Sequence, residues 1–373
     1  MEALRTLMAQ ISGVGDKMAS LADEVVQLII PSLVEQIESQ IEGLQTNALD
    51  VLNDVLVYAG TFVSSHAPLE QAVADILLSK LSSGRASLVR RGIQGLSFLS
   101  QVCRIHTYDA ILERGLAGLQ PPFLSEAVAV QLLGVLARET PQRLRPHKTK
   151  YTHGLISALE RANQKEEADE FRESCLVSLQ SLARMAGAEP ECMKGALETA
   201  LSMLQYDPNA MDAMDEDDIG DDLELDDDDM LDTFSDDDDL SWRVRRAASR
   251  LLGTLFEENP QEMVPSASRV TAALVERLKE REETVRLEAL GALKSVLIAA
   301  PEAFRSHTSI VEALCTWRGA AAQVAALDAL DKFVSSFGMA LSQGENALNL
   351  ALCAVEDETK THSKGRCIAG LAL

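Results

Sequence analysis

Apolar residues recur along this chain at steps of three and four, which is the spacing of one face of an α-helix. The pattern is clearest from Val285, where Ala289, Leu290, Leu293 and Leu297 continue the same face. Equivalent faces begin at Leu44, Val89, Val128, Phe171, Val244 and Ala322. Other amphipathic stretches lie between them, at residues 69–81, 108–119, 152–160, 193–204 and 263–279, and turns rich in proline separate the two sets. The chain therefore reads as a succession of helix pairs, and each of the seven faces marks the second helix of a pair.

The spacing of the second helices identifies the kind of repeat. Their starting points are separated by 45, 39, 43, 73, 41 and 37 residues, and all but one of these intervals lie near the period of about 40 to 47 residues of HEAT or armadillo units. Subtracting the 33 residues 207–239 reduces the interval of 73 to 40. We therefore expect an insertion between two repeats, with the repeat pattern continuing on both sides. Two helices rather than three in each unit favour HEAT.

The predicted fold class is an all-α HEAT-repeat α-solenoid, a superhelical stack of antiparallel helix pairs with one disordered acidic insertion. Aromatic residues make up only 4% of the chain, which suits thin layers of helices better than one large core. We expect four to five repeats in residues 1–206, an acidic inter-repeat loop at 207–240, and about three repeats in 241–373. The first and last repeats read as incomplete because neither end shows a polar capping helix, so we expect a piece of a longer protein.

The insertion is strongly acidic. Residues 212–239 carry 17 carboxylates and no lysine or arginine, within a chain whose net charge is −24. The acidic residues are Asp212, Asp215, Glu216, Asp217, Asp218, Asp221, Asp222, Glu224, Asp226, Asp227, Asp228, Asp229, Asp232, Asp236, Asp237, Asp238 and Asp239. Repulsion among so many like charges predicts a solvated, disordered segment. Such a segment can steer a basic partner or shield basic residues of the chain itself, and both alternatives stay open at this point.

Two groups of arginines are the candidate partner-binding residues. Arg90 and Arg91 lie on a predicted second helix, and Arg243, Arg245 and Arg246 directly follow the acidic segment. A HEAT solenoid spreads recognition over several repeats, because each repeat contacts only its neighbours. We therefore expect charge reversal at Arg90 with Arg91 to weaken binding, and no single substitution to abolish it.

The sequence contains no pattern that indicates catalysis or a bound cofactor or metal. Gly13-Val14-Gly15 lacks the third glycine and the preceding strand of a dinucleotide-binding loop, and an EF-hand frame placed on Gly220 puts Ile219 at a ligand position. The six histidines are dispersed among different repeats, and the six cysteines show no pairing pattern, which predicts buried free thiols. The acidic net charge argues against nucleic acid, and no apolar run is long enough for a membrane span. We expect a monomer located in the cytoplasm and nucleus.

Three stretches around the insertion resemble a known family. Residues 204–209 read LQYDPN, residues 235–248 read SDDDDLSWRVRRAA, and residues 278–283 read LKEREE. In kind and order they are similar to the cullin-associated, neddylation-dissociated (CAND) family, also described as TBP-interacting proteins. A weaker likeness of helix spacing covers residues 28–204.

The resemblance implies part of the N-terminal half of a large all-HEAT clamp around cullin-RING ubiquitin ligase scaffolds. The family binds unmodified cullins through the cullin C-terminal region and the RING subunit, and it promotes exchange of substrate-receptor adaptors during SCF complex assembly. The implied function is that of a non-enzymatic regulator of protein ubiquitination.

Two alternatives remain. An importin-β-like nuclear transport receptor, which binds Ran and cargo, is also built of HEAT repeats and has an acidic loop. That loop lies within a repeat, whereas the spacing here predicts an insertion between repeats. A regulatory subunit of an enzyme, such as a phosphatase scaffold, is the alternative from a different class, although the chain shows no catalytic constellation.

Overall fold

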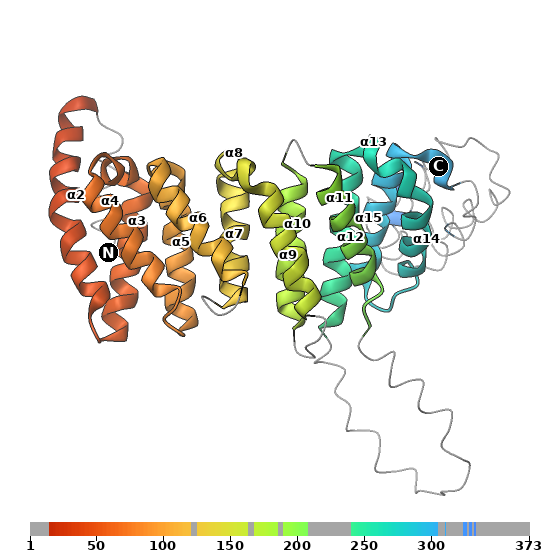
Figure 1. Cartoon of the computed structure of the whole chain (residues 1–373), viewed down its shortest axis with the longest axis horizontal. Helices are drawn as coiled ribbons and strands as arrows, with labels where there is room; N and C mark the ends of the chain where they lie inside the picture. Colours follow the sequence, from red (N-terminus) through yellow and green to blue (C-terminus); the bar gives the residue numbers. More distant parts are fainter. Residues whose placement is uncertain are drawn as a thin grey trace, which may run out of the picture. The chain divides into compact units, whose positions relative to one another are not determined.

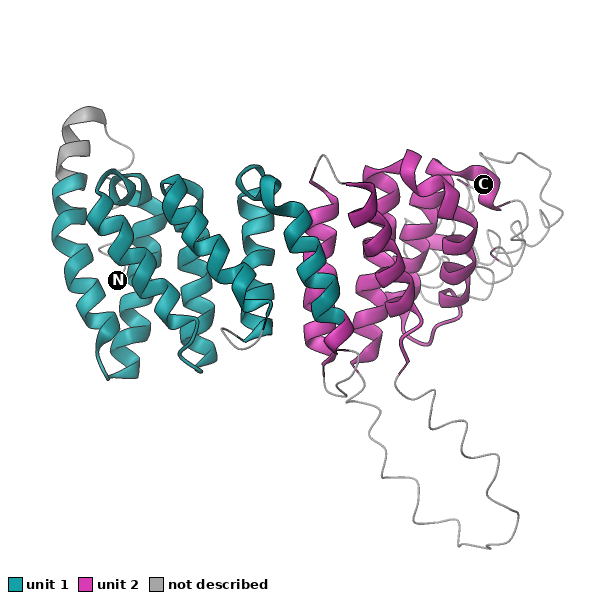
Figure 2. Cartoon of the chain, in the orientation of Figure 1, with its two compact units in different colours: residues 1–159 teal, residues 160–373 magenta. Residues whose placement is uncertain are grey.

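The computed structural model describes residues 15–120, 125–162, 168–185, 189–207 and 240–304, with a few further positions between 310 and 332. Every regular element in these ranges is helical (Figure 1). The chain divides into two compact units, Met1–Leu159 and Glu160–Leu373 (Figure 2). This boundary between the units does not coincide with the acidic segment, where the sequence predicts a division.

The first unit is built of helix pairs. Its helices are α2 (Gly15–Glu38), α3 (Glu42–Ser65), α4 (Ala67–Lys80), α5 (Ala86–Val102), α6 (Ile105–Gly118), α7 (Glu126–Glu139), α8 (Pro141–Leu144) and η1 (Arg145–His147), and α9 (Lys148–Ala162) contains the division between the units. The pairs are α2 with α3, α4 with α5, and α6 with α7. The second helices α3, α5 and α7 pack on one another in order, and the first helices α2, α4 and α6 form the other layer. Buried leucines such as Leu52 and Leu96 lie between the helices.

The second unit continues the same arrangement within itself. Its helices are α10 (Asp169–Ala183), α11 (Pro190–Leu204), α12 (Ser241–Glu258), α13 (Pro260–Met263), η6 (Val264–Ser266), α14 (Ala267–Arg277), α15 (Glu283–Ala299) and η7 (Pro301–Phe304). Helix α11 pairs with α12, and α14 pairs with α15. The second helices α10, α12 and α15 pack on one another in order, which is the stacking that a repeat solenoid requires.

Most of the predicted helices are confirmed. The faces that begin at Leu44, Val89, Val128, Phe171, Val244 and Val285 lie on α3, α5, α7, α10, α12 and α15. Most of the seventh face, from Ala322, falls outside the described residues. A single helix over 263–279 is wrong, because the chain forms α13, the 3₁₀ turn η6 and α14 there. Pro265 within η6 has no amide hydrogen to donate, so a regular α-helix cannot run through this turn.

The position of the acidic insertion also needs correction. Helix α11 packs closely on α12 and barely touches α10, so α11 and α12 are the two helices of one repeat. Residues 208–239 therefore connect the halves of a single repeat rather than two successive repeats. The spacing of second helices could not show this, because an insertion anywhere between two of them lengthens the interval equally. The predicted disorder of this segment lies outside the described residues.

Candidate functional site

The two candidate arginines of the first unit have different surroundings. Arg91 on α5 donates through Nε to Asp50 Oδ1 of α3 at 2.7 Å, while its carbonyl accepts a hydrogen bond from Asn53 Nδ2 at 3.2 Å. Arg91 therefore braces two neighbouring second helices. Arg90, one position earlier, is exposed, and it forms no ion pair with any described residue. Arg90 is thus the member of this group that can meet a partner.

The start of α12 carries an aromatic residue in contact with two cations. The guanidinium carbons of Arg243 and Arg246 lie 5.5 and 4.9 Å from the ring centroid of Trp242. Arg246 also donates to Glu173 Oε1 of α10 at 2.9 Å. Arg243 is half-buried and forms no ion pair within the described part of the chain. The cation–π contacts hold both arginines against the helix that bears them.

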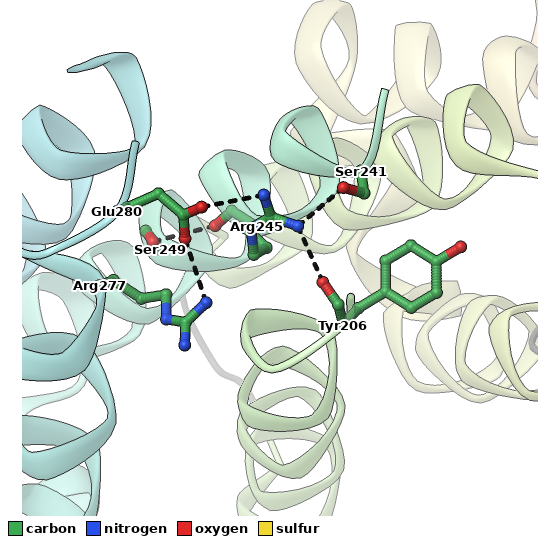
Figure 3. A network of polar contacts seen from close by, with 6 residues as sticks. All are labelled: Tyr206, Ser241, Arg245, Ser249, Arg277 and Glu280. Atoms are coloured by element: carbon green, nitrogen blue, oxygen red, sulfur yellow. Dashed lines mark hydrogen bonds and ion pairs between the residues drawn. The ribbon is translucent and has the colours of Figure 1, made fainter. Parts of the chain in front are cut away.

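Arg245 lies inside the repeat and is only 6% exposed. Its Nη1 donates to the carbonyl of Tyr206 at 3.0 Å and to Ser241 Oγ at 2.8 Å. Its Nη2 donates to Glu280 Oε1 at 3.0 Å, in the turn between α14 and α15 (Figure 3). The guanidinium therefore binds the chain's own helices, and the predicted partner-binding role of Arg245 is corrected to a structural one, because a partner needs an exposed side chain.

Glu280 and Ser249 complete this network. Glu280 accepts a second charged hydrogen bond from Arg277 Nη1 at 3.1 Å through its other carboxylate oxygen. Ser249 Oγ donates to the carbonyl of Arg245 at 2.9 Å, one turn further along α12 (Figure 3). The serines at 241 and 249 thus lie one turn on either side of the arginine, on the same helix face.

A second buried arginine, which the sequence reasoning missed, holds the other side of Tyr206. Arg172 of α10 donates to the Tyr206 hydroxyl at 3.0 Å, and its guanidinium carbon lies 4.6 Å from the Tyr206 ring centroid. It also donates to Asp169 at 2.6 Å and to the carbonyl of Ala162 at 2.8 Å. The signal in the sequence was the separation: Tyr206 lies 34 residues after Arg172 and 39 before Arg245, which is close to one repeat.

An arginine performs a related task in the first unit. Arg143 donates to the carbonyls of Ser100 and Cys103 at 2.5 and 2.8 Å, at the end of α5, and stacks 4.4 Å above the Tyr108 ring. The C-terminal end of a helix carries partial negative charge and free carbonyls, so a cation is favourable there. Burial raises the pKa of the Cys103 thiol and that of the Tyr108 hydroxyl above their usual values, although Arg143 opposes both shifts.

This arrangement is suited to holding helices together. Within the described ranges there is no group of three or more histidine, cysteine or carboxylate side chains placed to hold a metal ion. Among the helices that the structure describes, none is long and apolar enough to span a membrane. Cys103, Cys175 and Cys192 are buried thiols, as predicted. The acidic residues 212–239 lie outside the described residues.

Comparison with curated proteins gives the sequence relationship. No protein-family model matches the chain. The chain is 31% identical over 300 residues to Cullin-associated NEDD8-dissociated protein 1 of Drosophila melanogaster, a match that covers 79% of this chain and 23% of that protein. It is 30% identical over 298 residues to Cullin-associated NEDD8-dissociated protein 2 of Mus musculus, covering 74% of this chain and 22% of that protein.

Solved structures give the fold. Kap121p bound to Pho4p matches with a TM-score of 0.65 at 11% identity, over 99% of this chain and 35% of that one. Importin beta matches with a TM-score of 0.53 at 12% identity, over 99% of this chain and 49% of that one. At these identities the likeness concerns the fold alone, and it confirms the predicted all-α HEAT-repeat solenoid.

The sequence matches confirm the resemblance that residues 204–283 indicate. The chain is a homologue within the cullin-associated NEDD8-dissociated family, and it spans about a quarter of the length of the curated relatives that it matches.

Proposed function

We propose that this chain is a non-enzymatic regulator of cullin-RING ubiquitin ligases, which binds the unmodified cullin-RING scaffold and promotes exchange of substrate-receptor adaptors. The observation that carries the proposal is the 31% identity over 300 residues to a cullin-associated protein. The helical repeats agree with it, because stacked helix pairs present extended surfaces to large partners. The proposed contacts are the cullin C-terminal region and the RING subunit, bound by a monomer of this chain.

The binding surface we propose is the layer of second helices, and Arg90 on α5 belongs to it. Arg90 is exposed and forms no ion pair with any described residue. Arg91 contributes indirectly, by bracing α5 against α3 through Asp50. Of the arginines after the acidic segment, Arg243 is the one whose charge has no carboxylate partner in the described ranges.

The ion pairs of the arginines that follow the acidic segment bear on the role of that segment. Three of the four arginines that follow it already have carboxylate partners: Arg245 with Glu280, Arg246 with Glu173, and Arg250 with Glu288. Little positive charge remains beside the segment for it to shield. We therefore propose that residues 212–239 steer a basic surface of the partner, which long-range attraction accomplishes by raising the association rate.

A pull-down with purified baits tests the proposed function. Unmodified cullin-RING scaffold, the same scaffold carrying NEDD8, and Ran in its GTP form are immobilised separately and offered the purified chain. Retention by the unmodified scaffold alone is the expected result. Equal retention by the NEDD8-modified scaffold, or none by either scaffold, would contradict the proposal.

Salt dependence tests the role of the acidic segment. We expect the association rate with the scaffold to fall as ionic strength rises, because salt screens charges beyond about 10 Å at 0.1 M. Deletion of residues 212–239 should lower the rate at low salt and flatten its salt dependence. As a control, the deletion should leave the dissociation rate unchanged. If the association rates of the deleted and intact chains depended equally on salt, a steering role would be contradicted.

A nuclear transport receptor stays the second candidate because of one corrected observation. Since the acidic segment lies within the α11–α12 repeat, its position no longer separates this chain from an importin-β-like receptor. The sequence relationship favours the cullin regulator. Retention by Ran-GTP alone in the same pull-down would decide for the transport receptor.

The proposal places the chain in the cytoplasm and nucleus. The buried thiols of Cys103, Cys175 and Cys192 suit such reducing compartments. Imaging of the fluorescently tagged chain in cells tests this location.

A further inference from the structure

The repeat formed by α11 and α12 is closed although its two helices are far apart in the sequence. Helix α11 ends at Leu204 and α12 begins at Ser241, yet the two pack directly on each other. Helix α12 also packs on α10 and α15. The described contacts therefore join the helices on both sides of residues 208–239 without any contribution from those residues.

A single nitrogen atom of Arg245 binds the residues at both ends of the segment that connects α11 and α12. Arg245 Nη1 donates both to the carbonyl of Tyr206, at the end of α11, and to Ser241 Oγ, at the start of α12. Two acceptors of one donor must lie close to each other, so the chain leaves the repeat and re-enters it at neighbouring points. Because Arg245 is 6% exposed, these bonds are shielded from competing water.

The same guanidinium extends the contact to the next repeat. Its Nη2 binds Glu280, which also binds Arg277 of α14. On the other side, Arg172 holds the Tyr206 ring and hydroxyl and the carbonyl of Ala162. A continuous series of charged and polar contacts therefore runs from α10 to the turn before α15, and Arg245 is its central member.

We propose that Tyr206, Ser241, Arg245 and Glu280 form a clasp that closes the α11–α12 repeat, so that the backbone between Asp207 and Leu240 can be cut without separating the two parts of the chain. Apolar packing of α12 on α10 and α11 supplies most of the attraction between the parts. The clasp adds specificity, because Nη1 and Nη2 of the buried guanidinium meet all their acceptors only when the end of α11, the first turn of α12 and the turn before α15 are in place.

The test is a site-specific cut. A recognition sequence for a sequence-specific protease is inserted after Gly220 in the full chain, and the protein is cleaved and passed over a gel-filtration column. We expect the cleaved wild-type chain to elute as one species of unchanged size. Separation into two fragments, under conditions where the uncut protein is folded, would overturn the proposal.

The substitution Arg245→Met tests whether the clasp contributes to holding the two fragments together after cleavage. This substitution keeps the aliphatic volume and removes the guanidinium. In the cleaved protein we expect the fragments to dissociate at least about tenfold more readily than in the wild type, measured as a dissociation constant by dilution and gel filtration. Should the uncut Arg245→Met chain fail to fold, Arg245→Lys, which keeps the charge and loses the fork of donors, takes its place.

Arg250→Met is the matched control on the same helix. Arg250 forms its ion pair with Glu288 of α15, in the same fragment after cleavage, and only a weaker charge attraction to Glu173 of α10 reaches the other fragment. The dissociation constant of its fragments should therefore stay within about twofold of the wild-type value. If Arg245→Met also leaves the constant unchanged, the clasp does not join the two parts and the proposal fails.

Discussion

At the scale of single residues, the environment of each arginine decides what its charge does. Arg245 and Arg172 are 6% and 1% exposed and bind carbonyls and carboxylates of the chain's own helices and turns, whereas Arg90 is exposed. A fully buried arginine must satisfy its donors internally, since an unpaired buried charge is very costly. Arg245 and Arg172 therefore hold the fold together, whereas Arg90 can contact a partner.

Cys103 and Tyr108 give a prediction for alkaline pH. Burial raises the pKa of both groups above their ordinary values of 9.0 and 10.0, so the folded state keeps their protons at pH values where the unfolded state loses them. Their stabilising contribution is complete below pH 9 and is lost as the pH rises through the raised values. We expect the midpoint of thermal unfolding to fall from pH 9 upward.

Variants of these two residues test the assignment. The double variant Cys103→Ala with Tyr108→Phe removes both titrating groups, so its melting temperature should depend less on pH between 9 and 11 than that of the wild type. Thermal unfolding followed by circular dichroism at several pH values measures this. If the melting temperatures of the two proteins fell equally with rising pH, groups other than Cys103 and Tyr108 would cause the loss of stability at alkaline pH.

At the scale of elements, close helix packing limits what a glycine position accepts. A Cβ atom added at Gly95 of α5 would lie 2.6 Å from Asn53 Oδ1 and 2.7 Å from Leu77 Cδ2, and both neighbours are buried. Gly95→Ala should therefore destabilise the chain by roughly 1 to 3 kcal/mol. Chemical denaturation of the wild type and the variant measures the change in the free energy of unfolding.

Gly291 of α15 is the matched control for that substitution. It is exposed and a Cβ atom there would meet nothing within 4 Å. Gly291→Ala should be neutral or should stabilise the chain by up to about 1 kcal/mol, because alanine is the better helix former. A loss of stability at Gly291 equal to that at Gly95 would mean that contact with neighbouring helices is not the cause.

The acidic segment gives a second prediction for the elements around it. Deletion of residues 212–239 should leave the helical circular dichroism per molecule and the unfolding midpoint unchanged. The reason is that α11 and α12 pack directly and Arg245 holds the ends of the segment side by side, so residues 208–211 suffice to connect them. A large loss of helical signal or of cooperative melting would contradict this.

At the scale of the whole molecule, binding is expected to be spread over the layer of second helices. Arg90→Glu should weaken binding to the cullin-RING scaffold about two- to fivefold without abolishing it, as for a charge at the rim of an interface. Arg91→Glu is less informative, because it also breaks the pair with Asp50. Equilibrium binding measured by calorimetry gives the change in affinity.

Lys194→Glu is the control for that charge reversal. Lys194 is exposed on α11, a first helix of the second unit, so its reversal makes the same change in net charge on a helix that the proposed binding surface does not include. Its affinity should stay close to that of the wild type. Equal weakening by Arg90→Glu and Lys194→Glu would point to net charge, and not to the second-helix layer, as the cause.

The sequence by itself determined the local elements and their period. Apolar residues at steps of three and four specify which face of each helix is buried, and this is why the six second helices from α3 to α15 begin where the pattern predicts. The family relationship was also legible in the sequence, because residues 204–283 keep a distinctive order of aromatic, acidic and basic residues.

Only the tertiary structure decided which arginines are buried and where the acidic segment lies relative to the repeats. The interval between second helices shows that an insertion is present but not where in the interval it lies, so the acidic segment was assigned between repeats although α11 and α12 form one repeat. Likewise, Arg245 meets Tyr206 and Glu280 across separations of 39 and 35 residues. Contacts of this kind arise from the stacking of successive repeats, which a pattern along one helix does not contain.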